Sequence, residues 1–226
     1  MFWRMREAER GYVNARQETL EQIATRLAEI ARGFYSRGWA LGTSGNFSAV
    51  VDRDPLTLAM SPSGADKGSL SAEQILLIDQ NANVISDNPA RPSAESQLHV
   101  RIALEFGVGA VLHTHSVWST ALSDFYAPAG GLAIEGYEML KGLAGVQTHE
   151  HKEWLPIIEN SQDMFALADT VSKTLRRFPG AHGFLLQRHG LYTWGEDLDE
   201  ARRHVEILEF LLEAIGRGRT LNHSGD

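Results

Sequence analysis

The stretch Gly109-Ala-Val-Leu-His-Thr-His-Ser116 joins an apolar run to two closely spaced histidines, and the rest of the chain is best interpreted outward from it. Residues i and i+2 of a β-strand point to the same face of a sheet. His113 and His115 can therefore direct both imidazoles at one metal ion, at about 2.0–2.1 Å if the ion is zinc. Two histidines in one strand also fit simple solvent-facing alternation, so a metal site needs a third ligand from elsewhere.

Two other segments offer that third ligand. His189 lies in Arg188-His-Gly190 between two apolar runs, and its neighbouring glycine allows the backbone to approach a site closely. His149-Glu-His151 repeats the i, i+2 spacing, but it stands in a polar stretch without a strand pattern, which favours a surface loop. Three histidines and an open position are typical of catalytic zinc, and the sequence alone leaves manganese, iron and cobalt open.

Three short segments rich in glycine or serine are candidates for binding an anion. Gly42-Thr-Ser-Gly-Asn46 and Ser61-Pro-Ser-Gly64 stand at the ends of predicted strands, where several backbone N–H groups can point at one phosphate. Ser93 stands at the predicted N-terminus of a helix, which also attracts anions. Each segment alone is more typical of a turn or a cap. Together, beside a candidate metal site, they favour a phosphorylated ligand.

Hydrophobic spacing predicts helices interleaved with strands. The predicted helices are residues 20–34, 93–106 after a Ser93 cap, a helix capped by Ser116, one capped by Ser161 with Phe165, Ala168, Val171 and Leu175 inward, and one capped by Asp199. The predicted strands are residues 47–51, 56–60, 75–78, 109–115, 132–134, 154–158, 183–187 and 191–194, and 137–143 is expected to form one or two helical turns. Several strands follow one another through short turns, which indicates a mixed, largely antiparallel sheet covered by helices.

The bulk composition describes an ordinary globular chain. It has 226 residues, of which 43% are hydrophobic and 22% charged, and no linker interrupts the pattern. We therefore expect one domain over residues 1–226, with a loose polar tail over 216–226. There are no cysteines, so disulfides and thiolate metal sites are excluded, and any metal ligands are His, Asp or Glu.

Charge and hydropathy narrow the possible partners. The net charge of −8 lacks the basic footprint of a nucleic-acid-binding protein, and an acidic chain that binds an anion must create positive potential locally. No apolar run approaches the roughly 20 residues that span a bilayer. Residues 1–10 mix arginine with glutamate and lack an apolar core, so we expect no secretory signal. We expect the protein to be cytoplasmic.

The order of these motifs resembles a known family. A Gly-Asn loop, a Ser-Pro-Ser-Gly loop, Pro92-Ser-Ala-Glu95, His113-Thr-His115 and a late His189-Gly190 occur in the order found in the class II aldolase family of zinc enzymes, which also includes sugar-phosphate epimerases. Three further segments resemble the dehydratases of this family, which act on a phosphorylated ketose in methionine salvage. They are Glu138-Met-Leu-Lys-Gly-Leu143, Pro156-Ile-Ile-Glu-Asn160 and Arg188–Gly195.

The resemblance implies a fold, a cofactor and a set of site residues. The fold is a three-layer α/β/α arrangement around a mixed, mostly antiparallel sheet, in a homotetramer with active sites at the subunit interfaces. One Zn²⁺ per subunit falls on His113, His115 and His189. The phosphate pocket falls on Gly45, Asn46, Ser63, Gly64 and Ser93.

The acid/base residue is a choice between two glutamates. The aldolases place it at the position of Glu95 and the dehydratases at the position of Glu138. We predict Glu138, although spacing alone describes it as a surface charge beside Lys141. The alternatives to a dehydratase are a sugar-phosphate aldolase or epimerase and, from another class, a non-catalytic interaction module like the adducin head.

Overall fold

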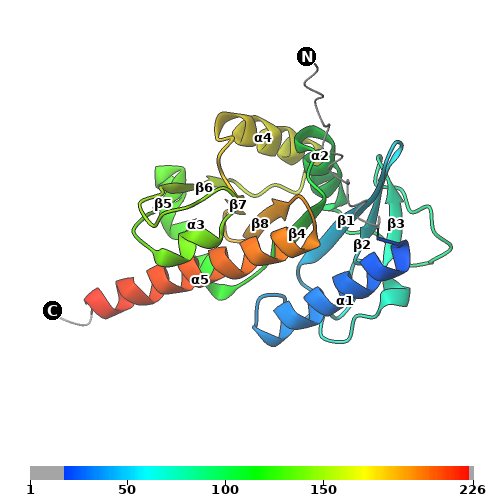
Figure 1. The fold of residues 1–226 in the computed structure, drawn as a ribbon, viewed down its shortest axis with the longest axis horizontal. Helices are drawn as coiled ribbons and strands as arrows, with labels where there is room; N and C mark the ends of the chain where they lie inside the picture. The colour runs from blue at the N-terminus through cyan, green and yellow to red at the C-terminus, as the bar shows by residue number, and fades with distance from the viewer. Residues whose placement is uncertain (1–17, 224–226) are drawn as a thin grey trace, which may run out of the picture.

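The structure is a computed structural model that describes residues 18–223, and its centre is an eight-stranded sheet (Figure 1). The strand order is β3-β2-β1-β4-β8-β7-β6-β5. The bounds are β1 (Asn46–Arg53), β2 (Leu56–Met60), β3 (Leu76–Asp79), β4 (Ala110–Thr114), β5 (Gly131–Ile134), β6 (Glu153–Ile158), β7 (Gly183–Leu186) and β8 (Gly190–Gly195). Neighbouring strands are antiparallel, except that β6 and β7 are parallel. The expected mixed, mostly antiparallel sheet is confirmed.

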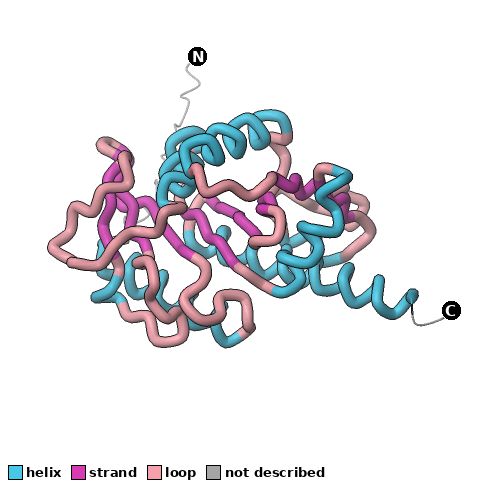
Figure 2. The backbone as a smooth tube through the Cα atoms, turned by 180° about the vertical axis from the view of Figure 1, so that it is seen from behind, coloured by secondary structure: helices cyan, strands magenta, loops and turns pink. Residues whose placement is uncertain are grey.

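Helices cover both faces of this sheet. They are α1 (Leu20–Ser36), α2 (Ser96–Phe106), α3 (Val117–Tyr126), α4 (Met164–Arg177) and α5 (Leu198–His223), with short 3₁₀ helices η1 (Ala72–Gln74), η2 (Ala127–Ala129) and η3 (Glu138–Gly142). Figure 1 shows α2 and α4 on one side and α1, α3 and α5 on the other, and the reverse view in Figure 2 agrees.

Alternation along the strands explains these layers. Val111 packs in a core cluster with α2 and α4, whereas its neighbour Leu112 packs in a cluster with α1 and α5. Leu186 and Leu185 divide between the two faces in the same way. Because successive side chains of a strand point to opposite faces, a strand buried on both faces reads as a continuous apolar run. The predicted three-layer α/β/α fold is confirmed.

Several predicted helix starts are displaced by a few residues. Ser93 does not cap α2, since Glu95 occupies that position, and Gly107 ends the helix with a φ of 67°. Asp163, not Ser161, caps α4 by accepting the N–H groups of Phe165 and Ala166. Phe165 is 68% exposed, so its predicted inward position is wrong. At α4, the short carboxylate of Asp163 satisfies the N–H groups that the sequence pattern assigns to Ser161.

The C-terminal helix is longer than expected. It begins at Leu198, and Asp197, rather than Asp199, accepts the N–H of Glu200. It continues to His223, so residues 216–223 are helical and do not form the expected loose tail. Residues 224–226 lie outside the described residues. Residues 1–10, for which no secretory signal is expected, also lie outside them. Across residues 18–223, no helix is both long and apolar enough to cross a membrane.

Candidate metal centre

Strand β4 lies in the middle of the sheet and brings two histidines to its carboxyl end. His113 is fully buried, its Nδ1 donates to the carbonyl of Leu191 at 2.9 Å, and its ring stacks on Tyr192 at 3.8 Å between centroids. His115 follows the end of the strand, and its backbone N–H donates to Trp39 at 2.7 Å. The two rings are therefore fixed by β8 and by the loop after α1.

His189 arrives from the turn between β7 and β8. Arg188 adopts a φ of 55°, and the N–H of His189 closes the turn on Leu186. Gly190 then packs so closely on β4 that an added Cβ would lie 2.0 Å from the carbonyl oxygen of Thr114. Only glycine allows this approach, which brings His189 against the His113–His115 pair.

This close contact gives a testable result. We expect Gly190→Ala to lower the free energy of unfolding by about 1–3 kcal/mol, because the methyl group must push β8 away from β4, and to reduce bound metal. Urea unfolding and elemental analysis measure the two effects. Gly180→Ala is the matched control, since a Cβ at Gly180 meets no atom within 4 Å. Unchanged stability and metal content in Gly190→Ala would contradict the proposed role of the close approach.

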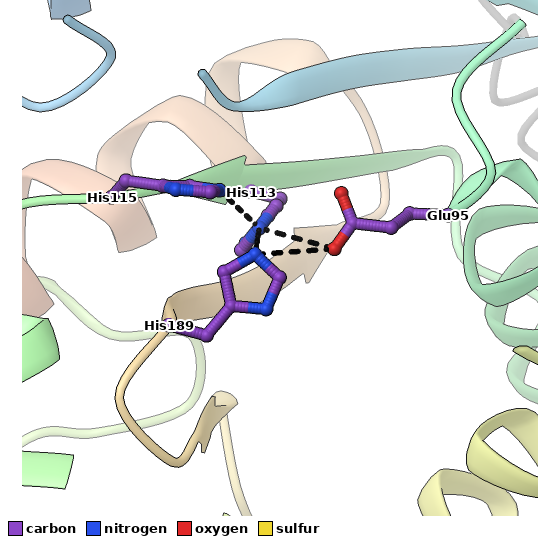
Figure 3. Close-up of side chains that lie close together, drawn as sticks. All are labelled: Glu95, His113, His115 and His189. Carbon is purple, nitrogen blue, oxygen red and sulfur yellow. Dashed lines mark hydrogen bonds and ion pairs between the residues drawn. The ribbon is translucent and has the colours of Figure 1, made fainter. Parts of the chain in front are cut away.

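Glu95 completes a compact group with the three histidines, as Figure 3 shows. The Nε2 atom of His113 lies 2.7 Å from that of His115 and 3.4 Å from that of His189. Oε1 of Glu95 lies 3.3 Å from His189 and 3.7 Å from His113. The four donor atoms lie within 4.8 Å of one another and point inward.

The protonation of these residues fits a cation at their centre. His113 uses its Nδ1 proton on Leu191, so its Nε2 presents a lone pair. Burial lowers the pKa of His113 well below its ordinary value and lowers that of His115 to about 4. Neutral imidazoles cannot all donate to one another at these distances, whereas three nitrogen lone pairs and a carboxylate form a typical donor set for a divalent ion. The donor set fits a metal.

A buried chain of hydrogen bonds holds Glu95 in place. Because a carboxylate only accepts, Asn46 turns its amide nitrogen to Oε2 of Glu95, at 2.6 Å, and its amide oxygen to Nε2 of His99, at 2.5 Å. His99 is fully buried, burial lowers its pKa to about 3, and its Nδ1 accepts from Ser48 at 2.7 Å. His99 belongs to no motif in the sequence, yet it fixes the amide of Asn46, and Asn46 in turn fixes Glu95.

The candidate phosphate residues lie on adjoining loops. Gly45 has a φ of 73°, and a Cβ there would lie 2.8 Å from the carbonyl oxygen of His113. Asn46 also donates to Ser93, at 3.4 Å, which connects the first and third segments. Ser63 and Gly64 line a hollow of about 810 Å³, and none of the three histidines of the group borders it. The structure therefore places Gly45, Asn46 and Ser93 beside the candidate metal centre, and their binding of phosphate stays a prediction.

Glu138 is not part of the histidine group. It lies on η3 with its side chain 72% exposed, and it accepts from Lys141 at 2.5 Å. Lys141 lowers the pKa of Glu138, so the carboxylate is ionised at neutral pH. Leu140 of the same turn packs in one core cluster with Leu191, which connects η3 to β8. Sequence reasoning placed Glu138 at the site, and its role stays a prediction.

A second group contains His151, Glu153 and His182. Nδ1 of His182 donates to the buried Glu153 and Nε2 donates to the carbonyl of Ala144, each at 2.9 Å. Burial alone would lower the pKa of His182, but the hydrogen bond and charge of Glu153 outweigh it and raise the pKa. His182 is thus satisfied as an imidazolium, so this group is better explained as a buried ion pair than as a metal site.

This ion pair predicts how stability depends on pH. A raised pKa in the folded state stabilises the protein below the ordinary pKa near 6.5, and this stabilisation is lost as pH rises through the raised pKa. Glu153, Glu200, His151 and His204 are the titratable groups near His182. We expect the melting temperature to fall as the pH rises above about 6.5, and to fall more steeply in the native chain than in His182→Gln. Parallel curves in a calorimetric series would count against this.

The structure thus gathers three histidines and a carboxylate beside the carboxyl end of β4, in the middle of a mixed sheet. The model of the class II aldolase and adducin N-terminal domain family matches residues 25–215. The chain belongs to this family.

Curated relatives are similar over nearly the whole chain. Methylthioribulose-1-phosphate dehydratase of Sorangium cellulosum (strain So ce56) is 39% identical over 196 residues, which cover 86% of this chain and 92% of the relative. The protein of the same name from Marinobacter nauticus (strain ATCC 700491 / DSM 11845 / VT8) is 42% identical over 191 residues, which cover 84% and 90%.

Solved structures share the fold. YgbL from Klebsiella pneumoniae superposes with a TM-score of 0.73 at 26% identity, and the match covers 88% of this chain and 91% of that one. L-fuculose-1-phosphate aldolase from Thermus thermophilus also gives a TM-score of 0.73, at 21% identity, and covers 92% and 100%. At that identity the second likeness supports the fold alone.

Proposed function

We propose that this protein is a metal-dependent hydro-lyase of methionine salvage that converts 5-methylthioribulose 1-phosphate into 2,3-diketo-5-methylthiopentyl 1-phosphate and water. The observation that carries the proposal is the convergence of His113, His115, His189 and Glu95 on one point. The relatives named methylthioribulose-1-phosphate dehydratase support the choice of substrate, since they match along most of both chains.

The three histidines would hold one Zn²⁺, the usual ion for three imidazole ligands. A bound divalent ion acts as a Lewis acid beside the ketone at C2 and makes the proton on C3 more acidic. Glu95, which Asn46 holds against the histidines, completes the donor set. A carboxylate committed to that position is poorly placed to shuttle a proton as well, and this favours a separate acid/base.

Glu138 is the acid/base in this proposal. Its ionised carboxylate takes the proton from C3 of the substrate and then delivers it to the C4 hydroxyl, which leaves as water. The enol that remains tautomerises to the 2,3-diketone, so the atoms balance without another reactant. The phosphate is held by the loops of Gly45 and Asn46, Ser63 and Gly64, and Ser93. As part of the same proposal, the chain acts as a homotetramer in the cytoplasm, with active sites at the subunit interfaces.

Product analysis tests the proposal directly. Purified protein loaded with zinc is incubated with 5-methylthioribulose 1-phosphate, and the diketone is followed by mass spectrometry. Two shorter carbonyl compounds would show aldol cleavage instead, and an isomeric sugar phosphate would show epimerisation. A protein that binds no metal and forms no product would fit a non-catalytic module like the adducin head.

A further inference from the structure

Lys67 carries a positive charge that is buried between two of the candidate phosphate loops. The residue is 1% exposed. Its Nζ donates to the carbonyl oxygen of Thr43 at 3.3 Å and to that of Ala65 at 3.0 Å. Thr43 precedes Gly45 and Asn46 in the first loop, and Ala65 follows Gly64 in the second. The ammonium group therefore lies where the two loops meet.

This charge has no partner of opposite sign close by. Within residues 18–223, no carboxylate lies at ion-pair distance from Nζ of Lys67, and both of its acceptors are neutral carbonyls. The carboxylate of its neighbour Asp66 instead accepts from Gly68 and Ser69. Burial lowers the pKa of Lys67, and the charge of Asp66 opposes this only in part. A buried ammonium without a counter-ion is costly, so a protein seldom retains one without a use for it.

The position of Lys67 relates it to the metal centre as well. Its positive charge contributes to the lowered pKa of His115, after burial and the charge of His189, so the ammonium lies within electrostatic range of that ligand. The chain as a whole is acidic, with a net charge of −8. A positive charge beside the loops therefore helps to attract an anionic group into this region.

We propose that Lys67 supplies the positive charge that binds the phosphate group of the substrate, and that the phosphate is the missing counter-ion of this buried ammonium. The inference rests on the proposed function for the identity of the phosphate ester. A neutral hydrogen-bond donor could link the two loops at a smaller desolvation cost. A purely structural role therefore does not explain why the side chain is charged. Lysine is a compact point charge that suits a phosphate held by several backbone N–H groups.

The test separates charge from hydrogen bonding. Lys67→Met removes both in a side chain of similar length, and Lys67→Gln keeps an N–H donor but removes the charge. Lys173→Met, at an exposed position of α4, is the matched control. Inorganic phosphate is the probe, and its dissociation constant is measured for each full-length protein by calorimetry and by the phosphate-dependent rise in melting temperature. The KM and kcat of diketone formation are measured in parallel.

We expect the phosphate dissociation constant to rise about 10- to 100-fold in both Lys67 variants, because both lose the positive charge that strengthens the hydrogen bond to phosphate. The melting temperature without phosphate should be unchanged or higher, since a buried charge has been removed, and KM should rise more than kcat falls. The control should behave as the native chain.

Three results would overturn the inference. The native chain shows no binding of inorganic phosphate, Lys67→Gln binds it as tightly as the native chain does, or Lys67→Met loses stability while its phosphate affinity stays the same. The last result would assign Lys67 to a structural tie. If the native chain binds phosphate through Lys67 but forms no diketone, the proposed reaction fails and the assignment of Lys67 stands.

Discussion

Replacing His189 by alanine is expected to remove the bound metal and to lower turnover by more than about 100-fold, since even residues behind metal ligands are worth about 10- to 100-fold. His189 is the one histidine of the group that comes from outside the region of β4, and its Nε2 lies 3.4 Å from that of His113. Its side chain is 19% exposed and lies in a turn, so the fold should persist without it.

Elemental analysis of the purified variant and the diketone assay measure the two losses. His149→Ala is the matched control, because sequence spacing made His149 part of a rival ligand pair and its side chain is 53% exposed. This control should keep its metal and its rate. Full metal content in His189→Ala, or loss of metal in His149→Ala, would mean that the ligand set is wrong.

The second large effect is expected at Glu138. Glu138→Gln should keep its metal and lose about 10²- to 10⁴-fold in turnover, because an amide has nearly the same shape as the carboxylate but cannot accept the C3 proton. The exposed position on η3 argues against loss of folding. Comparison of metal content, melting temperature and kcat with the native chain measures the effect.

Glu95→Gln is the companion variant, because Glu95 is the other candidate acid/base. Its carboxylate faces the histidines, so its loss should weaken metal binding as well as turnover. If Glu138→Gln retains a near-normal rate while Glu95→Gln does not, Glu95 is the acid/base and the chemistry is closer to that of the aldolases.

Much of the fold could be predicted because its signals are local. The apolar run before His113 and the alternating pattern around Phe47 each report on a single strand, and the short turns between strands predict antiparallel pairing. Gly38 and Gly107, which adopt left-handed conformations after α1 and α2, mark helix ends for the same local reason. The pairing of His113 with His115 follows from the strand period alone.

The remaining parts depend on contacts between distant residues. His99 and Lys67 look like ordinary polar residues in sequence, and only the packing shows that each is buried against a loop from another part of the chain. The ion pair of His182 with Glu153 likewise joins residues that are distant in sequence, so no local pattern predicts it. Phe165 is predicted to be buried but is exposed, because helical spacing does not show which turns of a helix extend beyond the elements it packs against.

His113 and His189 are 76 residues apart along the chain, and the pairing of β4 with β8 closes the loop between them. Closing so long a loop costs conformational entropy, which the burial of a hydrophobic core can offset. An ion bound only by His113 and His115 contributes little to closing this loop, because these two ligands are neighbours in sequence. We therefore expect the ion to bind after the chain has folded, in contrast to a zinc finger, whose fold depends on its metal. We expect chains made without metal to fold and to bind the ion when it becomes available. Their apparent stability would then rise with the free ion concentration.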